Sequence, residues 1–352
     1  MEIDPVAEAE GLIASGRAAE AAAALRARLK AGRGGLLART TLVKALLASD
    51  DVAAALEEAR EAAALNPGIA IAAMSLGEAL LAANALPAAI AELQRALRLD
   101  PSLERARFLT ASAWLEAGEA EKALAIFAEL ESSSAIETLA ARARAMRQAP
   151  RSDAGYVRHL FDQFSADYDS RMLGQLSYAA PQILRDLFEL VMPGREHLSI
   201  LDLGCGTGLA GAMFRDKAAR LDGIDLSPAM IAKARARGIY DTLIVGDIET
   251  MPAGRYDLIL AADTLVYLGD LGPLIRTLGA HLSPEGYFLF TTEAKDGEGF
   301  EFGPKRRWRH SEAYLREEAG VAGLSVAGLV AASPRTEANQ PVAGFAIALT
   351  LP

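Results

Sequence analysis

The stretch Ile200-Leu201-Asp202-Leu203-Gly204-Cys205-Gly206-Thr207-Gly208 decides how the second half of this chain folds. An apolar run from Leu198 to Leu203 ends in three glycines at alternate positions, and a helical pattern follows from Leu209 to Leu221. A strand, a glycine turn and a helix in this order form a cradle for a nucleotide cofactor. Glycine is needed because the backbone turns sharply and a ligand lies directly on it, without a Cβ in the way.

The glycines alone do not identify the cofactor. Residues 206–211 also satisfy the pattern G-x-G-x-x-G of dinucleotide-binding proteins. The next apolar run, from Leu221 to Leu226, contains Asp225, an acid at the right separation to accept hydrogen bonds from a ribose diol. Asp225 would therefore fit a dinucleotide as well as another cofactor that contains a ribose.

Two further acidic residues narrow the choice of cofactor. Asp202 at the strand end makes the pattern D-x-G-x-G-x-G, and Asp247 follows a third predicted strand over 242–245. This combination resembles the class I S-adenosylmethionine-dependent methyltransferases, and the resemblance continues through a fourth strand at 256–263 and a fifth at 282–290. It implies that the glycine loop lies under the methionine part of the cofactor, that Asp225 holds the ribose and that Asp247 meets the adenine amine. A Rossmann domain for another nucleotide remains the alternative.

The resemblance also supplies the cofactor-binding residues that we expect. Ser227 and Pro228 are typical of a helix start, which brings Leu226 and Met230 close to the sugar and adenine. Cys205 is expected to be a small apolar filler rather than a reactive thiol. The full expected set is Tyr168, Asp202, Gly204, Cys205, Gly206, Gly208, Asp225, Leu226, Met230, Asp247, Ile248, Ala262, Asp263 and Tyr267.

Tyr168 enters this set through the segment that opens the second domain. Residues 156–169 resemble a lead-in that lies over the cofactor as a lid in many small-molecule methyltransferases. Phe161, Phe164 and Tyr168 have helical spacing, so packing in the core is the alternative.

The expected catalytic residues are Asp263, Tyr267 and His310. The first two follow the fourth strand, and open α/β sheets bind ligands beyond the carboxyl ends of their strands. Asp263 would alternatively cap a helix. His310 is a candidate proton acceptor that ends a basic run in a predicted long loop over 294–310; the run is Lys305, Arg306, Arg307, Trp308, Arg309 and His310.

The basic run has two interpretations. Arginine pairs with carboxylates through two parallel hydrogen bonds, so the run predicts an anionic methyl acceptor steered by this loop. The alternative is a solvated loop whose surface salt bridges contribute little energy. The residues suggest no metal site.

The charge balance excludes some functions. The chain of 352 residues has a net charge of −10, of which about −4 lies before residue 150, so neither half has the basic footprint of a nucleic-acid-binding protein. A small molecule or a protein is the expected acceptor. Without a signal peptide or a long apolar run, the chain is expected to be cytoplasmic and to have no membrane partner.

The first half is a repeat of 34 residues, rich in alanine and leucine. The repeated positions are Ala21, Ala55, Ala89 and Ala123, and also Gly16, Asp50, Asn84 and Gly118. This pattern resembles the tetratricopeptide repeat (TPR), a helix-turn-helix unit of that length. We expect four units plus a capping helix over 135–147. The array either docks a partner protein in a concave groove, or packs on the catalytic domain or dimerises.

The predicted organisation is therefore a TPR-like domain over 1–148, a linker over 149–155 and a methyltransferase domain over 156–352. The fold class is an α-helical repeat array followed by a Rossmann-like α/β domain with a seven-stranded, mostly parallel sheet and a C-terminal antiparallel hairpin. The whole resembles bacterial predicted methyltransferases that carry an N-terminal TPR array. A non-catalytic TPR scaffold that senses S-adenosylmethionine, and a nicotinamide (NAD)-linked oxidoreductase, are the alternative functions.

Overall fold

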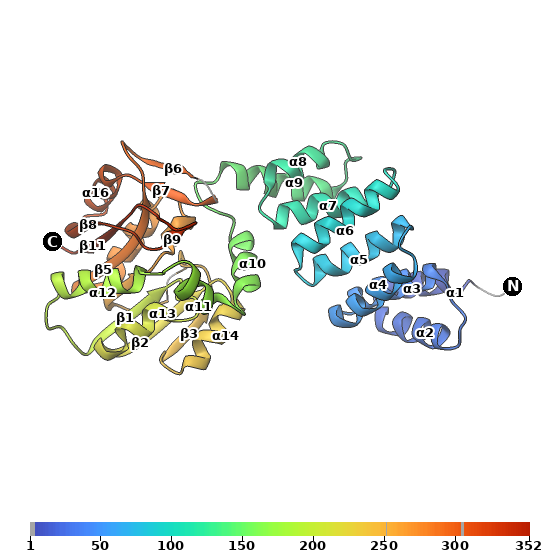
Figure 1. Cartoon of the computed structure of the whole chain (residues 1–352), viewed down its shortest axis with the longest axis horizontal. Helices are drawn as coiled ribbons and strands as arrows, with labels where there is room; N and C mark the ends of the chain where they lie inside the picture. Colours follow the sequence, from blue (N-terminus) through green and yellow to red (C-terminus); the bar gives the residue numbers. More distant parts are fainter. Residues whose placement is uncertain (1–3, 251, 304–305) are drawn as a thin grey trace. The chain divides into compact units, whose positions relative to one another are not determined.

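The computed structural model describes residues 4–250, 252–303 and 306–352. The chain divides into two compact units, Met1–Gln148 and Ala149–Pro352 (Figure 1). Each unit has its own buried apolar clusters, and each is described by itself below.

The described part of the first unit is entirely helical. Its alanine- and leucine-rich segments favour helix strongly, and alanine also lets neighbouring helices approach closely. The helices are α1 (Pro5–Ala14), α2 (Ala18–Lys30), α3 (Leu36–Ala48), α4 (Val52–Leu65), α5 (Ala70–Ala82), α6 (Leu86–Leu99), α7 (Glu104–Glu116), α8 (Ala120–Phe127) and α9 (Ser134–Gln148).

The helices repeat with the 34-residue period of the sequence. The starts of α2, α4, α6 and α8 follow one another at this interval, as do those of α3, α5 and α7. A left-handed residue ends the turn before each of the even-numbered helices, which explains why glycine, aspartate and asparagine recur there. These residues are Gly16 (φ 78°), Asp50 (φ 62°), Asn84 (φ 61°) and Gly118 (φ 74°).

Small residues lie where paired helices touch. The four repeated alanines (Ala21, Ala55, Ala89 and Ala123) are completely buried. Gly77 of α5 faces α6 so closely that a Cβ at this position would lie 2.6 Å from Cγ of Leu93. The last helix, α9, buries Ala140 and Ala143 against α7 and α8.

The second unit alternates helices and strands. Its helical elements are α10 (Ala154–Phe164), α11 (Tyr168–Ser170), the π-helix η1 (Arg171–Gln175), α12 (Ala180–Val191), α13 (Leu209–Phe214), η2 (Arg215–Lys217), α14 (Pro228–Arg237), η3 (Leu265–Tyr267), α15 (Gly272–His281) and α16 (Glu312–Val321). Its strands are β1 (Leu198–Leu203), β2 (Ala218–Asp225), β3 (Thr242–Val245), β4 (Tyr256–Ala261), β5 (Leu282–Ala294), β6 (Phe300–Phe302), β7 (Trp308–His310), β8 (Ser325–Ala332), β9 (Thr336–Glu337), β10 (Gln340–Pro341) and β11 (Gly344–Thr350).

The main sheet has the strand order β3-β2-β1-β4-β5-β11-β8. The first five strands of this order are parallel, while β11 runs antiparallel to both β5 and β8. The last strand is therefore inserted between β5 and β8, and the seven-stranded, mostly parallel sheet predicted from the sequence is confirmed. The order reverses between β1 and β4, which is the position where open α/β sheets bind ligands.

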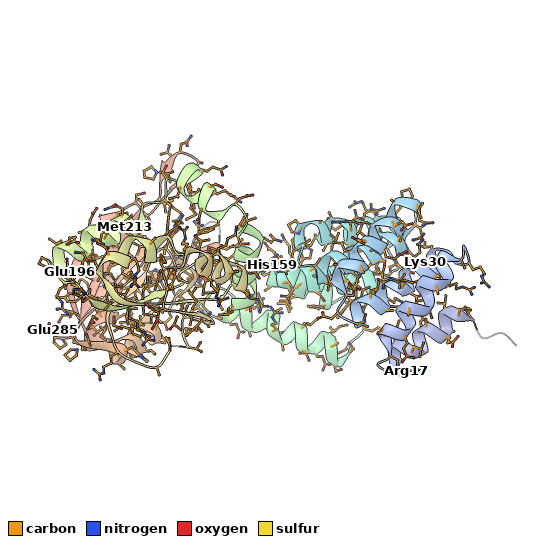
Figure 2. All side chains as sticks on the ribbon, turned by 90° about the horizontal axis from the view of Figure 1, so that it is seen from below. Arg17, Lys30, His159, Glu196, Met213 and Glu285 are labelled. Carbon is orange, nitrogen blue, oxygen red and sulfur yellow. The ribbon has the colours of Figure 1, made fainter. Side chains whose placement is uncertain are left out.

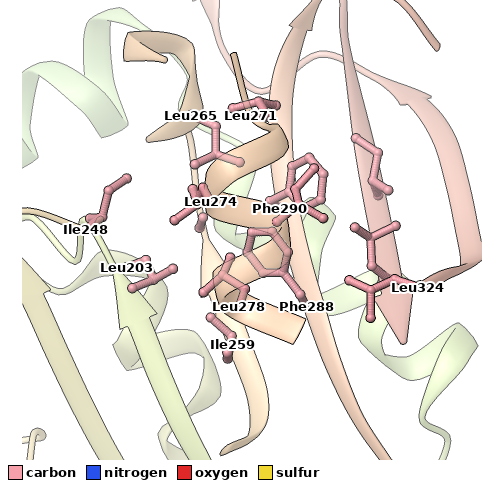
Figure 3. Packing of buried hydrophobic residues seen from close by; sticks show 14 of the residues in the cluster. Leu203, Ile248, Ile259, Leu265, Leu271, Leu274, Leu278, Phe288, Phe290 and Leu324 are labelled. Carbon is pink, nitrogen blue, oxygen red and sulfur yellow. The ribbon is translucent and has the colours of Figure 1, made fainter. Parts of the chain in front are cut away.

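Helices cover both faces of this sheet, so neighbouring residues of a strand enter different clusters. Leu201, Ile259 and Phe288 pack against α15 and α16 on one face, as the buried side chains around Leu274 and Leu278 show (Figure 3). Residues one position away, such as Ile200, Leu258 and Leu289, pack against α12 and α13 on the other face. Burial on both faces explains the continuous apolar runs that mark these strands in the sequence.

The segment predicted as a long loop over 294–310 is different. β5 continues to Ala294, β7 pairs in parallel with its end, and β6 pairs antiparallel with β7. Trp308 packs against Phe300 and Phe302 across this small ribbon, with ring centroids 5.6 and 5.0 Å apart. The prediction of a loop was wrong because these aromatic contacts join residues of two short strands.

The segment over 149–155, interpreted as a linker, is bonded to the second unit. The carbonyl of Pro150 accepts hydrogen bonds from Gly269 N and Asp270 N, and Ser152 N donates to Tyr267 O at 2.8 Å. None of the helices in the described ranges combines the length and the apolar character that crossing a membrane requires.

The close contact at Gly77 predicts that a glycine-to-alanine substitution changes the free energy of unfolding in opposite directions at Gly77 and at Gly11. Gly77→Ala should lower the free energy of unfolding by about 1 kcal/mol, because overpacking against Leu93 outweighs the better helix propensity of alanine. Gly11→Ala in α1 should raise it by about 0.5–1 kcal/mol, because a Cβ there meets nothing within 4 Å. Thermal unfolding of the full chain, monitored by circular dichroism, measures both changes in stability. Equal shifts of both variants would contradict close packing at Gly77.

Candidate functional site: two adjoining cavities

The loop after β1 is held by hydrogen bonds to the end of β2. Gly204 N donates to Ile224 O at 2.8 Å, and Gly206 N donates to Asp225 Oδ2 at the same distance. The other oxygen of Asp225, Oδ1, accepts from Ser227 N at 2.8 Å. Asp225 therefore fixes the glycine loop relative to the start of α14.

Two glycines of this loop are left-handed for different reasons. At Gly204 (φ 67°) a Cβ would lie 2.3 Å from Cγ2 of Thr264, so close packing excludes a side chain. At Gly206 (φ 54°) the position of a Cβ is open space, and this space belongs to a cavity. The second glycine leaves room for a ligand that lies on the backbone.

The first cavity lies at the carboxyl ends of β1, β2 and β4 and has a volume of about 640 Å³. A side pocket of about 270 Å³ continues under the glycine loop, where Cys205, Thr207, Leu209 and Ala210 line it. The lining of the first cavity is Arg151, Ser152, Val157, Phe161, Tyr168, Gly204, Gly206, Asp225, Leu226, Asp247, Ile248, Ala262, Asp263, Thr264, Tyr267 and Leu268.

Most of the residues expected to bind a cofactor line the first cavity or its side pocket. The residues brought together there are Tyr168, Gly204, Cys205, Gly206, Asp225, Leu226, Asp247, Ile248, Ala262, Asp263 and Tyr267. The structure places Asp202, Gly208 and Met230 outside this lining. Gly208 (φ 92°) is instead the first residue before α13, and the side chain of Met230 is completely buried.

Asp202 lies beneath the glycine loop. Its Oδ2 accepts a hydrogen bond from Tyr240 OH at 2.7 Å, and burial raises the pKa of this carboxyl to about 6. The ring of Tyr240 also packs against Gly208 and Gly211. Asp202 therefore supports the loop through Tyr240, while its other oxygen, Oδ1, is buried and has no hydrogen-bond partner among the described residues.

Asp225 is almost completely buried, yet it lines the first cavity. Burial raises the pKa of its carboxyl to about 6, while the hydrogen bonds from Ser227 N and Gly206 N lower it. The backbone donors orient both oxygens, and the remaining lone pairs are available to hydroxyl donors of a ligand.

Two residues that the sequence analysis did not predict also line this cavity. Arg151 donates to Asp247 Oδ2 at 2.8 Å and to Glu249, so it holds the carboxylate that follows β3. Ser152 is nine-tenths buried, and its Oγ has no hydrogen-bond partner among the described residues. An unpaired buried hydroxyl in a cavity wall is expected where the partner is a ligand.

A second cavity of about 1030 Å³ adjoins the first. Phe161, Tyr168, Asp263 and Tyr267 belong to the walls of both. Its other walls are apolar and basic: Tyr156, Leu160, Phe164, Arg171, Met172, Leu176, Arg307 and Arg335. These four side chains therefore lie at the junction of the two cavities.

The segment predicted as a lid contributes to both cavities. Phe161 of α10 packs edge-on against Tyr168 and Tyr267, with ring centroids 6.1 and 5.6 Å apart. Two carboxylates of this segment accept hydrogen bonds from the residue before α14 and from the glycine loop. Asp162 Oδ1 accepts from Ser227 Oγ at 2.5 Å, and Asp169 accepts from Thr207 Oγ1 at the same distance.

A cluster of ionic side chains forms part of the wall of the second cavity. Arg335 is fully buried and donates to Asp263, to Glu293 and, at 3.0 Å, to Glu337. Arg307 also pairs with Glu337, and its Nη1 lies 3.5 Å from Glu293. The sequence analysis missed Arg335 because a single arginine in the turn after β8 carries no motif signal.

The structure places His310 away from both cavities. Its ring is completely buried beside Tyr314, its Nε2 lies 2.9 Å from Gly269 O, and burial lowers its pKa to about 4. We therefore do not assign it as the proton acceptor. His159 on α10 (Figure 2) lines neither cavity.

The basic run also does not form the solvated surface loop that was its alternative interpretation. Arg306 stacks on Tyr156 at 4.7 Å, Arg307 joins the cluster, and Arg309 lies 3.7 Å from Glu293. Lys305 lies outside the described residues. The described residues contain no group of three or more His, Cys, Asp or Glu arranged to hold a metal ion.

Comparison with known proteins agrees with this geometry. Residues 169–324 match the family described as "Methyltransferase domain". Human methyltransferase-like protein 27 is 33% identical over 141 residues, which are 38% of this chain and 56% of that protein. The malonyl-(acyl-carrier protein) O-methyltransferase of Enterobacter lignolyticus is 31% identical over 144 residues, 38% of this chain and 55% of the relative. The chain thus spans about half the length of these curated relatives.

One solved structure to which this chain is similar is the magnesium protoporphyrin IX methyltransferase of Synechocystis PCC 6803 with bound S-adenosylhomocysteine (SAH). It is 18% identical, with a TM-score of 0.47, and the match covers 57% of this chain and 100% of that one. The second unit is a Rossmann-like domain, and its first cavity lies where the strand order reverses between β1 and β4. It contains a class I S-adenosylmethionine-dependent methyltransferase domain, and S-adenosylmethionine is the cofactor of this class.

Asp225 should make cofactor binding depend on pH. Above about pH 6 its carboxylate is ionised and accepts hydrogen bonds from ribose hydroxyls, whereas protonation at lower pH removes an acceptor. The affinity for S-adenosylhomocysteine should therefore fall as the pH drops through about 6. Asp225→Asn should weaken binding at pH 8 by about 1–3 kcal/mol and abolish this dependence. Calorimetric titration from pH 5 to 8 measures both; a variant with unchanged affinity and pH profile would exclude Asp225 from the site.

A side chain at Gly206 should weaken cofactor binding beyond any effect on stability. Gly206→Val would fill the open space above the loop, so the affinity for S-adenosylhomocysteine should fall at least tenfold. The positive φ strains valine here, so the melting temperature should also fall, as it should in a variant with the same strain elsewhere. Gly238→Val, at another left-handed position with open space, is the matched control and should leave the affinity unchanged. Wild-type affinity in Gly206→Val would show that the cofactor does not lie on this loop.

Proposed function

We propose that this chain is a methyltransferase that transfers the methyl group of S-adenosylmethionine to a small molecule bound in the second cavity. The observation that carries the proposal is the wall shared by the two cavities. Phe161, Tyr168, Asp263 and Tyr267 would touch both the cofactor and the acceptor. Methyl transfer requires the two reactants to be held at about 3–3.5 Å in line, which adjoining cavities permit.

The fit of the first cavity supports S-adenosylmethionine as its ligand. Asp225 offers acceptor oxygens to a ribose, Asp247 offers one to an amine, and Ser152 has an unused hydroxyl. The loop around Gly206 carries no lysine and needs none, since this cofactor has no phosphate groups. When bound, the cofactor supplies a methyl group on a positively charged sulfur, which a nucleophile displaces.

The protein's own contribution is to orient the acceptor and to exclude water. Phe161, Tyr168, Tyr267 and Asp263 line both cavities, and Phe161 packs edge-on against Tyr168 and Tyr267. One of the relatives is named an O-methyltransferase, and we propose oxygen as the methylated atom here. The anionic acceptor expected from the basic run is not carried forward, because Arg307 and Arg309 pair with protein carboxylates.

For the first unit we propose a tetratricopeptide-like array of four helical pairs and a capping helix. Support comes from the 34-residue interval between helix starts and from the left-handed residue that recurs in each turn. Such an array serves to dock a protein or to form an oligomer. A protein methyl acceptor held by this array is the second candidate function.

Two alternative functions are less well supported. A scaffold that only senses the cofactor would have no need of a second cavity beside the first. A nicotinamide-linked oxidoreductase would need a family other than the one that residues 169–324 match. S-Adenosylmethionine carried through purification, or bound on titration, separates the methyltransferase from the oxidoreductase.

A labelling experiment tests the proposed function. The full chain, incubated with methyl-tritiated S-adenosylmethionine and a fractionated cell extract, should transfer label to molecules below about 1 kDa. Gly206→Val should reduce this transfer at least tenfold, because it blocks the cofactor cradle, and Gly238→Val should not. Label that appears only in proteins would replace the small-molecule acceptor by a protein one. Cofactor binding without any transfer would favour the sensing scaffold.

A further inference from the structure

Asp263 differs from every other charged residue of the ionic cluster. It lines both cavities, and its backbone N donates to Thr291 Oγ1 at 2.8 Å. Its φ of 57° is left-handed, a conformation that aspartate adopts more readily than most residues. Arg335 binds its Oδ1, whereas no partner is recorded for its Oδ2 within the described ranges. One carboxylate oxygen is therefore available at the junction of the cavities.

The guanidinium groups of the cluster are already engaged. Arg335 is completely inaccessible, and each of its nitrogens donates to a carboxylate. The carboxylate partners are Asp263, Glu293 and Glu337. A carboxylate ligand would have to displace one of these partners and leave a buried charge unpaired, which costs several kcal/mol.

Arg307 is similarly occupied. It pairs with Glu337 and Glu293, and Tyr267 lies beside it. These neighbours, together with Asp263, raise its pKa although burial acts in the opposite direction. Together, Arg307 and Arg335 face the three carboxylates of Asp263, Glu293 and Glu337, so an incoming anion would meet a net negative charge at this cluster.

The rest of the second cavity is apolar and aromatic. Leu160, Met172 and Leu176 contribute aliphatic side chains to its lining, and Tyr156, Phe161, Phe164, Tyr168 and Tyr267 contribute aromatic rings. Arg171 also lines it, is exposed and stacks on Phe164 at 4.5 Å. Its charge is therefore solvated, unlike those of the buried cluster.

From this arrangement we infer that the acceptor is an uncharged hydroxyl compound with a flat apolar body, and that Asp263 accepts the proton of its hydroxyl. The inference rests on the proposed methyl transfer. The body would lie among the aromatic and aliphatic walls, with its hydroxyl donating to Asp263 Oδ2.

The reaction balances with these groups alone. The acceptor oxygen forms a bond to the methyl carbon, the bond between carbon and sulfur breaks, and its electron pair stays on sulfur. The proton of the hydroxyl passes to Asp263, so the positive charge lost from sulfur is matched by the negative charge lost from the carboxylate. Burial raises the pKa of Asp263, although Arg335 and Arg307 lower it, and a raised pKa suits a proton acceptor.

Two probes of equal size separate a neutral from an anionic acceptor. Protein saturated with S-adenosylhomocysteine is titrated with 2-naphthol and with 2-naphthoate at pH 7.5 in a calorimeter. The inference predicts that 2-naphthol binds and that 2-naphthoate binds at least tenfold more weakly. Tighter binding of 2-naphthoate, or binding of neither probe, would overturn it. Failure to bind S-adenosylhomocysteine itself would instead overturn the proposed function.

A variant then tests Asp263. Methyl transfer from labelled S-adenosylmethionine to 2-naphthol should fall at least 100-fold in kcat in Asp263→Asn, with KM for 2-naphthol changed less than tenfold. Asp186→Asn, at an exposed carboxyl of α12, is the matched control and should keep wild-type turnover. Wild-type turnover in Asp263→Asn would exclude it as the proton acceptor. If Asp263→Asn does not fold, as judged by circular dichroism, the comparison of the two probes on the wild-type protein decides.

Discussion

The carboxylate of Asp225 is the constraint on which the first cavity depends. It accepts one backbone hydrogen bond from the glycine loop and one from the start of α14, so a single side chain sets the distance between two ligand-facing segments. Burying this group is unfavourable for its charged form, as its raised pKa shows, and the two N–H donors offset part of that cost. The same oxygens face the cavity. Asp225 must be ionised to accept hydrogen bonds from a ribose. The two backbone N–H groups that it positions help to keep it ionised at neutral pH.

The sequence was informative wherever the functional residues are local to one strand and the turn after it. The glycine loop, Asp225 and Asp247 each follow a strand whose apolar run is visible, and parallel strands bring their carboxyl ends to one edge. The 34-residue period was equally visible, because each turn needs a left-handed residue and each helix pair needs small residues. The pattern predicts Asp202 as a cofactor-binding residue, but it could not predict that this residue also supports the loop from outside the cavity lining. Its partner, Tyr240, lies 38 residues away.

The second cavity could not be derived in this way because its charged residues come from distant segments. Arg335 meets Asp263 across 72 positions, and Arg307 meets Glu337 across 30. The basic run was misleading for a related reason. In β7, consecutive side chains point to opposite sides, so Arg309 faces Glu293 while Trp308 and His310 pack on Phe300. A run of charges in the sequence says nothing about these directions until the strand is recognised.

The segment predicted as a lid, together with the residues that follow it, is bonded to the walls of both cavities. On the cofactor side, Asp169 accepts a hydrogen bond from Thr207 of the glycine loop. Further along the chain, Leu176 O accepts a hydrogen bond at 2.7 Å from Thr336 N, in the turn that carries Arg335. Ligands in the two cavities would therefore contact the same stretch of chain. If this contact couples the two binding equilibria, the coupling is reciprocal: an acceptor that raises the affinity for the cofactor has its own affinity raised by the cofactor by the same factor.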